Sequence, residues 1–360
     1  MPEQATERRK TIRVVAERAG CSVATVSRVI NGSGPSSADT RARVEAAIAD
    51  LGFRPNILGQ SLRTQRVRAI GVIVPSFTNP VFAASLAGIE AVARGAGRQL
   101  LLSATDYDPA HEDDSVETLL HQRVEALILT VADAASSTAL KRLDGAGVPY
   151  ILLHNRPRQP GRRAVTVDNH GAAAGLTRRL IALGHRRVAY IGGPFRTTDR
   201  SALRFEGCKA AMAEAGLAAP ALLELDYLAG IDDHAAVLER ALPRLGNPTA
   251  LLCSNDLLAL SVIAALRLIG RAVPGDLSVT GFDGIAFGRM VSPSLATVAT
   301  PTRAMGERAM RRLMTILSGA EDTAPAVELL PYEFRPGGTL AAVPGGRAGK
   351  SERRSPARPS

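Results

Sequence analysis

Several residue types are scarce in this chain of 360 residues, and each scarcity excludes a class of protein. There is no tryptophan, aromatic residues make up 4%, and the three cysteines, Cys21, Cys208 and Cys253, form no CxxC pair. Isolated cysteines in apolar or helical patterns are expected to be buried thiols, not a disulfide or a metal site. No apolar run approaches the roughly 20 residues of a membrane helix. Because residues 1–10 are charged and polar, they lack the pattern of a secretory signal, and we expect a cytoplasmic protein with no membrane partner.

The sequence also lacks the side-chain combinations that enzymes need. His154, His170 and His185 show neither metal-ligand spacing nor a nucleophile partner. We find no acid-base pair and no nucleophile with its base. These absences predict a protein that is not an enzyme and that uses no metal and no cofactor.

Positive charge is concentrated at the two ends of the chain. The net charge is +10; residues 1–68 carry 12 Lys and Arg against 6 Asp and Glu, residues 69–340 carry 27 of each kind, and residues 341–360 carry 5 against 1. A basic head on a neutral body is typical of a DNA-binding module joined to a small-molecule sensor, because Lys and Arg gain affinity for phosphates by releasing counterions. The tail at 341–360 is rich in Gly, Pro, Ser and Arg and is predicted to be disordered, as are residues 1–10. The tail either adds nonspecific attraction to DNA or is only a solvated end.

The N-terminal sequence shows two short helical patterns joined by a tight turn, followed by a third. In the first, Thr11 is placed to cap the helix and Gly20 to end it in the left-handed conformation. Ser22 is placed to cap the second, and the third begins at the cap Ser37 and ends at Gly52. The apolar faces have helical spacing and consist of Ile12, Val15, Ala16 and Ala19, then Val26, Val29 and Ile30, then Val44, Ala47, Ile48 and Leu51.

The other face of the second helix is the candidate DNA-reading surface. Val23, Ala24, Ser27 and Arg28 point outward there, which suits a helix in a major groove better than a helix covered by protein. Three short helices of this kind predict an all-α helix-turn-helix head. An ordinary helical hairpin would show the same short pattern, so the two helices alone leave both interpretations open.

From about Ala69 the chain alternates apolar strand-like runs with amphipathic helices, in two series. Strands separated by single helices predict an α/β core of parallel sheets with helices on both faces, here in two lobes. Ligands of such folds bind where the carboxyl ends of the strands converge. The first series predicts strands at 69–75, 99–105, 126–131 and 150–155 and helices at 81–97, 112–122 and 137–147; the second, after 165–168, predicts strands at 187–193, 250–254 and 276–283 and helices at 204–216 and 257–270.

From Thr11 to about Leu340 the chain resembles the lactose-repressor/galactose-repressor (LacI/GalR) family of bacterial transcription regulators. The matching motifs occur in the family's order: SVATVSRVING (22–32), RPN (54–56), SLR (61–63), GVIVPSFTNPVF (71–82), GHRRVAYIGG (184–193), SNDLLALSVIAAL (254–266) and DLSVTGFDG (276–284). The resemblance implies a helix-turn-helix domain at 11–54, a hinge helix and linker at 55–68, and a periplasmic-binding-protein-like effector-binding and dimerisation domain at 69–340. The two lobes of that domain would comprise 69–167 with 300–328, and 168–299 with 329–340, and the chain would cross between them near Val167, near Thr297 and around 331–334.

By the same resemblance, the head contacts bases through Val23, Ala24 and Arg28. Arg28 can bond a guanine edge, while the other two offer apolar contact, for example to a thymine methyl group. The hinge, with Asn56 and Gly59, would insert Leu62 of each subunit into the minor groove, which implies a homodimer on a pseudo-palindromic operator with a central CpG step. Phosphate contacts, which position the head without specifying sequence, fall on Ser22, Thr25, Ser27, Asn31 and Thr40.

Candidate effector contacts lie just after strands of the core. Arg204 can form bidentate bonds to vicinal hydroxyls or a carboxylate, and Asp283 can accept hydrogen bonds from hydroxyls. Together with an aromatic wall, such groups predict a polyhydroxylated effector, most simply a sugar or related polyol. The resemblance places ligand contacts at Asn79, Phe82, Asn155, Arg156, Arg204, Tyr227, Asn255 and Asp283.

Some of these positions have a second explanation. Asn255 and Asp283 each begin a loop or helix after a strand and could be caps instead, and Asp168 is better explained as a hinge or cap. Thr300 stands where many sugar-sensing relatives carry Gln, which removes an amide donor and leaves the sugar class open. A transport binding protein would share the two-lobed core, but it would need an export signal and no helix-turn-helix.

The sequence as a whole thus predicts a repressor that binds its operator as a homodimer under allosteric control by a ligand between the lobes. The N-terminal lobe is expected to form most of the dimer contact, through helix 81–97 and its neighbours.

Gly59 gives a prediction of its own, because the family usually has Ala at this position of the hinge helix. Glycine costs a helix about 1 kcal/mol through backbone entropy. We therefore expect Gly59→Ala to tighten operator binding and to blunt its release by ligand, as measured by gel shift. Unchanged operator affinity would contradict this expectation.

Overall fold

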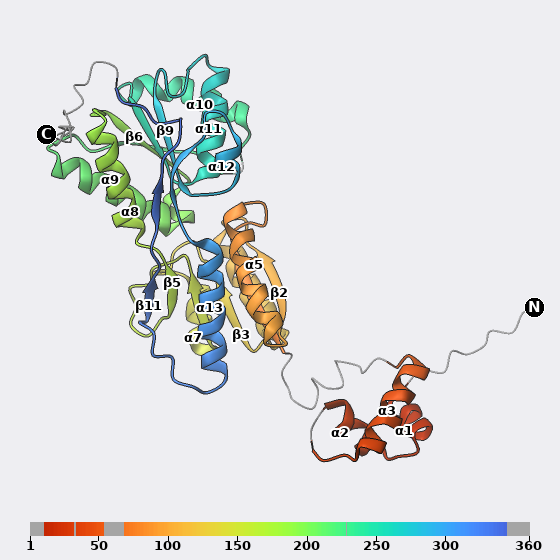
Figure 1. The fold of residues 1–360 in the computed structure, drawn as a ribbon. Helices are drawn as coiled ribbons and strands as arrows, with labels where there is room; N and C mark the ends of the chain where they lie inside the picture. The colour runs from red at the N-terminus through yellow and green to blue at the C-terminus, as the bar shows by residue number, and fades with distance from the viewer. Residues whose placement is uncertain (1–10, 32–33, 54–67, 228, 344–360) are drawn as a thin grey trace, which may run out of the picture. The chain divides into compact units, whose positions relative to one another are not determined.

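The computed structural model describes residues 11–31, 34–53, 68–227 and 229–343. The chain forms two compact units, Met1–Val67 and Arg68–Ser360, each of which is described by itself (Figure 1). The expected disordered N-terminus, most of the expected hinge segment and most of the basic tail lie outside the described residues, as do Asn56, Gly59 and Leu62.

The N-terminal unit is a three-helix head of α1 (Ile12–Ala19), α2 (Val23–Asn31) and α3 (Ala38–Leu51). Its core consists of the predicted apolar faces, with Val15, Val26 and Val44 fully buried. Phe53, which the helical patterns did not include, closes the same core. The predicted all-α head is thus confirmed.

Most of the predicted helix ends in the head are confirmed as well. Gly20 ends α1 with φ 61°, and Gly52 ends α3 with φ 55°. Ser22 Oγ accepts a hydrogen bond from Thr25 N at 3.1 Å, and Ser37 Oγ accepts one from the first turn of α3. The expectation for Thr11 is wrong, because its side chain makes no capping bond and only its backbone carbonyl serves α1.

The C-terminal unit contains two six-stranded sheets, as the alternation of strands and helices predicts. All neighbouring strands are parallel except β10 and β12. The first sheet has the order β11 (Val327–Leu329), β5 (Ala164–Thr166), β4 (Tyr150–Leu153), β3 (Ala126–Leu129), β1 (Ala69–Val74), β2 (Gln99–Ala104). The second has the order β12 (Glu333–Arg335), β10 (Ala296–Ala299), β9 (Ser278–Asp283), β8 (Ala250–Cys253), β6 (Val188–Gly192), β7 (Ala221–Glu224).

Helices cover both faces of each sheet and define two lobes (Figure 1). The central strands are buried along their whole length, so each sheet is the middle layer of its lobe. In the first lobe these helices are α5 (Pro80–Gly95) packed on α13 (Thr302–Leu317), and α6 (Pro109–His121) packed on α7 (Thr138–Ala146). In the second lobe they are α8 (Asn169–Ala182) packed on α9 (Asp199–Glu214), and α10 (Ile231–Arg244) packed on α11 (Asp256–Leu268), with the short α12 (Phe287–Met290) and a 3₁₀ turn at Phe195–Thr197.

The chain passes between the sheets after β5, after β10, and between β11 and β12. The crossing expected near Thr297 is displaced, because Thr297 lies within β10 and the chain leaves the second sheet only after Ala299. The helix expected at 204–216 begins five residues earlier, at Asp199. Arg200 and Arg204 therefore lie one turn apart on the same face of α9.

Two glycines allow α5 and α13 to cross at close range, and Figure 1 shows these helices side by side. A Cβ on Gly88 would lie 2.1 Å from the carbonyl oxygen of Arg303, and a Cβ on Gly306 would lie 2.1 Å from that of Ser85. Backbone therefore meets backbone at both positions, and neither side can yield as a flexible side chain would.

We expect Gly88→Ala to lower the free energy of unfolding by about 1 to 3 kcal/mol, because overpacking forces the two helices apart. Urea unfolding monitored by circular dichroism measures this change. Gly95→Ala is the matched control on the same helix, since no atom lies within 4 Å of the added methyl group. Equal unfolding midpoints for the two variants would contradict the proposed crossing.

Candidate functional site

The exposed face of α2 carries the three residues predicted to contact bases. Val23 is 40% exposed, Ala24 and Arg28 are exposed, and Val26 and Val29 face the core instead. Arg28 Nε donates to the carbonyl oxygen of its own helix at Ala24 with a distance of 3.4 Å, and the other guanidinium donors have no partner among the described residues.

Three of the residues predicted to contact phosphates, Ser22, Thr25 and Thr40, lie at the starts of α2 and α3. The hydroxyls of Ser22 and Thr25 lie 2.8 Å apart at the start of α2, and those of Ser37 and Thr40 lie 2.8 Å apart at the start of α3. Free N–H groups and the helix dipole make such ends favourable for phosphate. Ser27 is half-buried on α2, and the side chain of Asn31 lies outside the described residues.

In the C-terminal unit, two adjoining cavities lie between the lobes at the carboxyl ends of strands. The inner chamber, of about 40 Å³, is lined by charged side chains that include Arg200, Arg204 and Asp283. The outer chamber, of about 370 Å³, is lined by apolar side chains such as Ile231 and Leu257 together with hydroxyl groups. The residues that line both chambers are Asn79, Tyr107, Tyr227 and Asn255.

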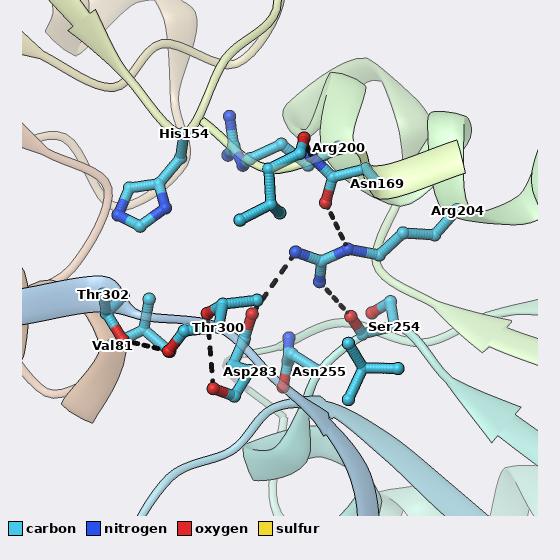
Figure 2. Close-up of polar contacts among 12 residues, drawn as sticks. Val81, His154, Asn169, Arg200, Arg204, Ser254, Asn255, Asp283, Thr300 and Thr302 are labelled. Atoms are coloured by element: carbon cyan, nitrogen blue, oxygen red, sulfur yellow. Dashed lines mark hydrogen bonds and ion pairs between the residues drawn. The ribbon is translucent and has the colours of Figure 1, made fainter. Parts of the chain in front are cut away.

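Arg204 lines the inner chamber, and Figure 2 shows its contacts with Asn169, Ser254 and Asp283. Its guanidinium donates from Nε to Asn169 Oδ1 at 2.8 Å, from Nη2 to Asp283 Oδ1 at 3.3 Å, and from Nη1 to the carbonyl oxygen of Ser254. It also stacks over the ring of Phe282, with 3.6 Å between the guanidinium carbon and the ring centroid. Burial raises the pKa of Asp283 to about 6, and the adjacent Arg204 limits the rise. The second carboxylate oxygen of Asp283 has no hydrogen-bond partner among the described residues, so it can accept from a ligand.

Asn79 and Asn255 act as helix caps and still face the chambers. Asn79 Oδ1 accepts from Val81 N at 3.1 Å, and Asn255 Oδ1 accepts from Leu258 N at 2.8 Å. The alternative explanation of Asn255 as a cap is therefore correct for its carbonyl oxygen. Its amide nitrogen has no partner within the described ranges and is free to donate to a ligand. The cap assigned to Asp168 is also confirmed, on Gly171 N at 3.0 Å.

Aromatic rings close the walls of the two chambers. Phe82 packs edge-on against His154, with 5.7 Å between the ring centroids. His154 Nε2 lies 3.0 Å from Ser85 Oγ, and burial lowers the pKa of His154 to about 3, so the ring is neutral. The hydroxyl of Tyr227 lies 2.7 Å from Ser254 Oγ, which holds its ring at the chamber wall.

Two of the predicted effector contacts, Asn155 and Arg156, do not line either chamber. Asn155 is fully buried; its Oδ1 accepts from Val131 N at 2.9 Å, and its Nδ2 donates to Val131 O and to the carboxylate of Asp199. Arg156 is exposed and lies 3.7 Å from Asp168. His154 is the residue of this segment that faces the cleft, and its left-handed backbone, with φ 71°, ends the alternation of the strand before Asn155 and Arg156. Thr300 likewise turns its hydroxyl to the carbonyl oxygen of Asp283.

Arg200, Tyr107 and His154 line the cleft although they were not predicted as ligand contacts, and two of them had a sequence signal. Arg200 lies four positions before Arg204, so a helix that began earlier would have placed both on one face. Tyr107 follows β2 as the other candidates follow their strands. His154 shares its post-strand segment with two residues that face elsewhere, and nothing in the sequence singles it out.

A second cluster of buried polar groups joins the lobes beside the inner chamber. Asp199 N donates to Ala132 O at 2.7 Å, and its carboxylate accepts from Ala134 N at 3.2 Å. Arg200 Nη1 donates to Val131 O at 2.8 Å, so the first turn of α9 holds the loop after β3. From the first lobe, Glu112 Oε1 accepts from Ala132 N at 2.6 Å, so the loop is held from both sides.

A helix-turn-helix head followed by a two-lobed α/β core defines the class of DNA-binding regulators. The sequence pattern described as "Bacterial regulatory proteins, lacI family" matches residues 11–56, and that described as "Periplasmic binding protein-like domain" matches residues 177–340. The HTH-type transcriptional regulator GntR of Escherichia coli K12 is 33% identical over 337 residues, which are 93% of this chain and 99% of the relative. Catabolite control protein A of Priestia megaterium is 31% identical over 329 residues, 90% of this chain and 98% of the relative.

Solved structures agree with this assignment. The lac repressor dimer bound to operator and the anti-inducer ONPF has a TM-score of 0.81 at 28% identity, with 92% of this chain and 99% of that chain covered. The chain therefore belongs to the lacI family of bacterial regulatory proteins. Like its relatives it is a DNA-binding transcriptional regulator and not an enzyme. Within the described ranges, no helix has the length and apolar character needed to cross a membrane, and no group of side chains has the composition of a metal site.

The buried carboxyl group of Glu112 makes stability depend on pH. Burial raises the pKa of Glu112 from its ordinary 4.5 to about 7, so its ionisation opposes folding as the pH rises between these values. Gln keeps the acceptor oxygen and cannot ionise. We expect Glu112→Gln to raise the free energy of unfolding at about pH 8 by on the order of 1 to 3 kcal/mol, and this gain to shrink towards about pH 4.5. Urea unfolding across this pH range tests the prediction.

Glu117→Gln is the control for this series, because Glu117 lies on the same helix and is half-exposed. If the stability difference between Glu112→Gln and wild type did not vary with pH, the prediction would be wrong, because ionisation of Glu112 would then not destabilise the folded state.

Proposed function

We propose that this protein is a repressor that binds a pseudo-palindromic operator as a homodimer and responds to a small hydroxylated effector, a sugar or related polyol, held between the lobes. The observation that carries the proposal is the Arg204–Asp283 pair in a cleft between the two sheets, with the amide of Asn255 beside it, in a chain that also has a helix-turn-helix head. Allostery requires two distinct binding sites in one protein, and the cleft and the DNA-reading face of α2 would be these two sites.

On the DNA side, we assign base contacts to Val23, Ala24 and Arg28. Arg28 has the donors for a guanine edge, and the exposed Val23 side chain suits a thymine methyl group. The hydroxyl pairs at the starts of α2 and α3 suit phosphate oxygens. The hinge contacts expected at Asn56, Gly59 and Leu62 remain proposals from the sequence.

On the effector side, the cleft has donors and acceptors without a partner among the described residues, and these favour a ligand with hydroxyl groups. Asn255 Nδ2 offers a donor and Asp283 Oδ2 an acceptor, and a sugar hydroxyl can pair with either. The assigned contacts are Asn79, Phe82, Arg204, Tyr227, Asn255 and Asp283, joined by His154 and Arg200. Relatives of known structure include a CelR–cellobiose complex at 29% identity and TM-score 0.67, which supports a sugar as ligand.

The surface of the second lobe supports self-association. Phe287, Met290 and Val291 are 52%, 75% and 39% exposed, and such neighbouring apolar side chains are typical of an interface. Helix α5 was expected to carry most of the dimer contact, yet it exposes only small or charged side chains such as Ala87 and Glu90. We therefore propose a dimer contact that includes α12, in line with the lac repressor dimer that shares this fold.

The experiment selects an operator from random DNA with the purified protein and measures its affinity by fluorescence anisotropy. We expect salt-sensitive binding that falls when one half-site is removed, because a dimer reads two half-sites. Arg28→Ala should weaken operator binding about tenfold or more and relax the preference at one base position. Arg178→Ala, an exposed change of equal charge on the second lobe, should not.

The effector arm screens sugars, polyols and nucleosides for a rise in melting temperature, because a ligand of the folded state stabilises it. A hit should also change operator affinity, and Asn255→Ala should abolish both effects. Binding without sequence preference, or no response to any hydroxylated compound, would overturn the proposed function.

A further inference from the structure

We propose that Tyr107 is a further effector-contact residue and that it forms, with Tyr227, an aromatic gate between the outer and inner chambers. The inference rests on the proposed function of the cleft as the effector site. It adds a second tyrosine, from the first lobe, to the proposed effector contacts, which already include Phe82 and Tyr227.

The two tyrosines approach each other from opposite lobes. Tyr107 lies in the turn after β2, and Tyr227 lies in the segment after β7. Their ring centroids are 5.2 Å apart with the planes tilted by 44°, and both rings line both chambers. The pair therefore stands at the boundary between the chambers.

The inner chamber is too small for a sugar while the pair is closed. Its volume is about 40 Å³, which is room for only a few water molecules, because one water needs roughly 10 to 15 Å³ of such cavity volume. A ligand that bonds Arg204 and Asp283 must therefore separate the two tyrosine rings and occupy part of the space that the rings now fill. The outer chamber, at about 370 Å³, is large enough to receive it first.

The contacts of the two rings differ, so one is fixed and the other can move. Tyr227 is held by its 2.7 Å bond to Ser254 and lies against Gly193, where a Cβ would be only 2.3 Å from the ring. Within the described part of the chain, the side chain of Tyr107 has a single long hydrogen bond, which its hydroxyl accepts from Asn79 Nδ2 at 3.4 Å. The geometry thus makes Tyr227 the fixed half and Tyr107 the movable half.

The backbone at Tyr107 is strained in a way that is common at ligand sites. Asp106 and Tyr107 have φ values of 49° and 61°, so two consecutive residues with side chains occupy the left-handed region. Such conformations persist where the surrounding structure holds them, and they cluster at ligand clamps and switches.

The chemistry of Tyr107 suits a hydroxylated ligand. Its burial between the lobes raises the pKa of the hydroxyl to about 12, so the group keeps its proton at all physiological pH values. Since the hydroxyl accepts from Asn79, its own proton is available for an oxygen of the effector. The face of the ring offers apolar contact to C–H groups opposite Tyr227.

The chain provides its own spectroscopic probe for this gate. It has five tyrosines and no tryptophan, so tyrosine emission is not lost by transfer to tryptophan, and two of the five rings lie in the cleft. We would titrate the full-length protein with D-glucose, D-galactose, D-xylose, D-gluconate and D-sorbitol and follow tyrosine emission, calorimetric affinity and stopped-flow association. At least one probe should bind and change the emission.

Tyr107→Ala removes the movable ring, so it should weaken binding about tenfold and speed association at least about threefold. Tyr107→Phe keeps the ring and loses only the hydroxyl bond, so it should weaken binding by about threefold to fivefold at an unchanged association rate. Tyr150→Phe is the matched control, because the Tyr150 hydroxyl bonds Asp144 outside the cleft, and this variant should behave as wild type.

The outcomes separate the gate from the effector site itself. Binding that requires Asn255 but has the same affinity and rate in Tyr107→Ala as in wild type would overturn the gate alone. If no probe binds, or if Asn255→Ala binds as well as wild type, the proposed effector site fails and the gate with it. Tyr107→Phe keeps the ring, so it decides the affinity question if Tyr107→Ala does not fold.

Discussion

The buried guanidinium of Arg204 is the interaction on which the cleft depends. It ties together the start of α8 through Asn169, the end of β8 through Ser254 and the end of β9 through Asp283. A charge taken out of water is tolerated only when it is paired and fully hydrogen-bonded, and loss of one partner leaves the other buried and unpaired. These bonds give the converging strand ends of the second lobe a fixed polar geometry. The site is therefore distinct from the apolar core beneath it.

Helix α9 connects this site with the relation between the lobes. Its first turn holds the loop after β3 of the first lobe through Asp199 and Arg200, and one turn later Arg204 holds the second-lobe strand ends. A helix is stiff over a single turn. A ligand that displaced Arg204 would therefore also displace Asp199 and strain its hydrogen bond to the loop after β3. This arrangement supports the proposed coupling between effector and operator, because residues of both lobes contact the same short stretch of α9.

Sequence reasoning succeeded where the deciding interactions are local. The caps at Ser22 and Ser37, the left-handed Gly20 and the apolar faces of the head all depend on contacts within one or two turns. It failed in the segment after β4, where His154 faces the chamber while Asn155 and Arg156 do not. The direction of each of these side chains is set by the end of the strand and by the left-handed backbone of His154, at φ 71°, and neither is visible in the residue types.

The sequence by itself determined the class of the protein: a helical DNA-reading head, an alternating α/β core and polar residues such as Asp283 at strand ends. Only the tertiary structure decided which of those polar residues share a chamber, that Tyr107 meets Tyr227, and that the loop after β3 meets Asp199. The physical reason is the separation of the partners along the chain. Arg204 and Asp283 are 79 positions apart within one lobe, and Tyr107 and Tyr227 meet from different lobes, so no local periodicity encodes either contact.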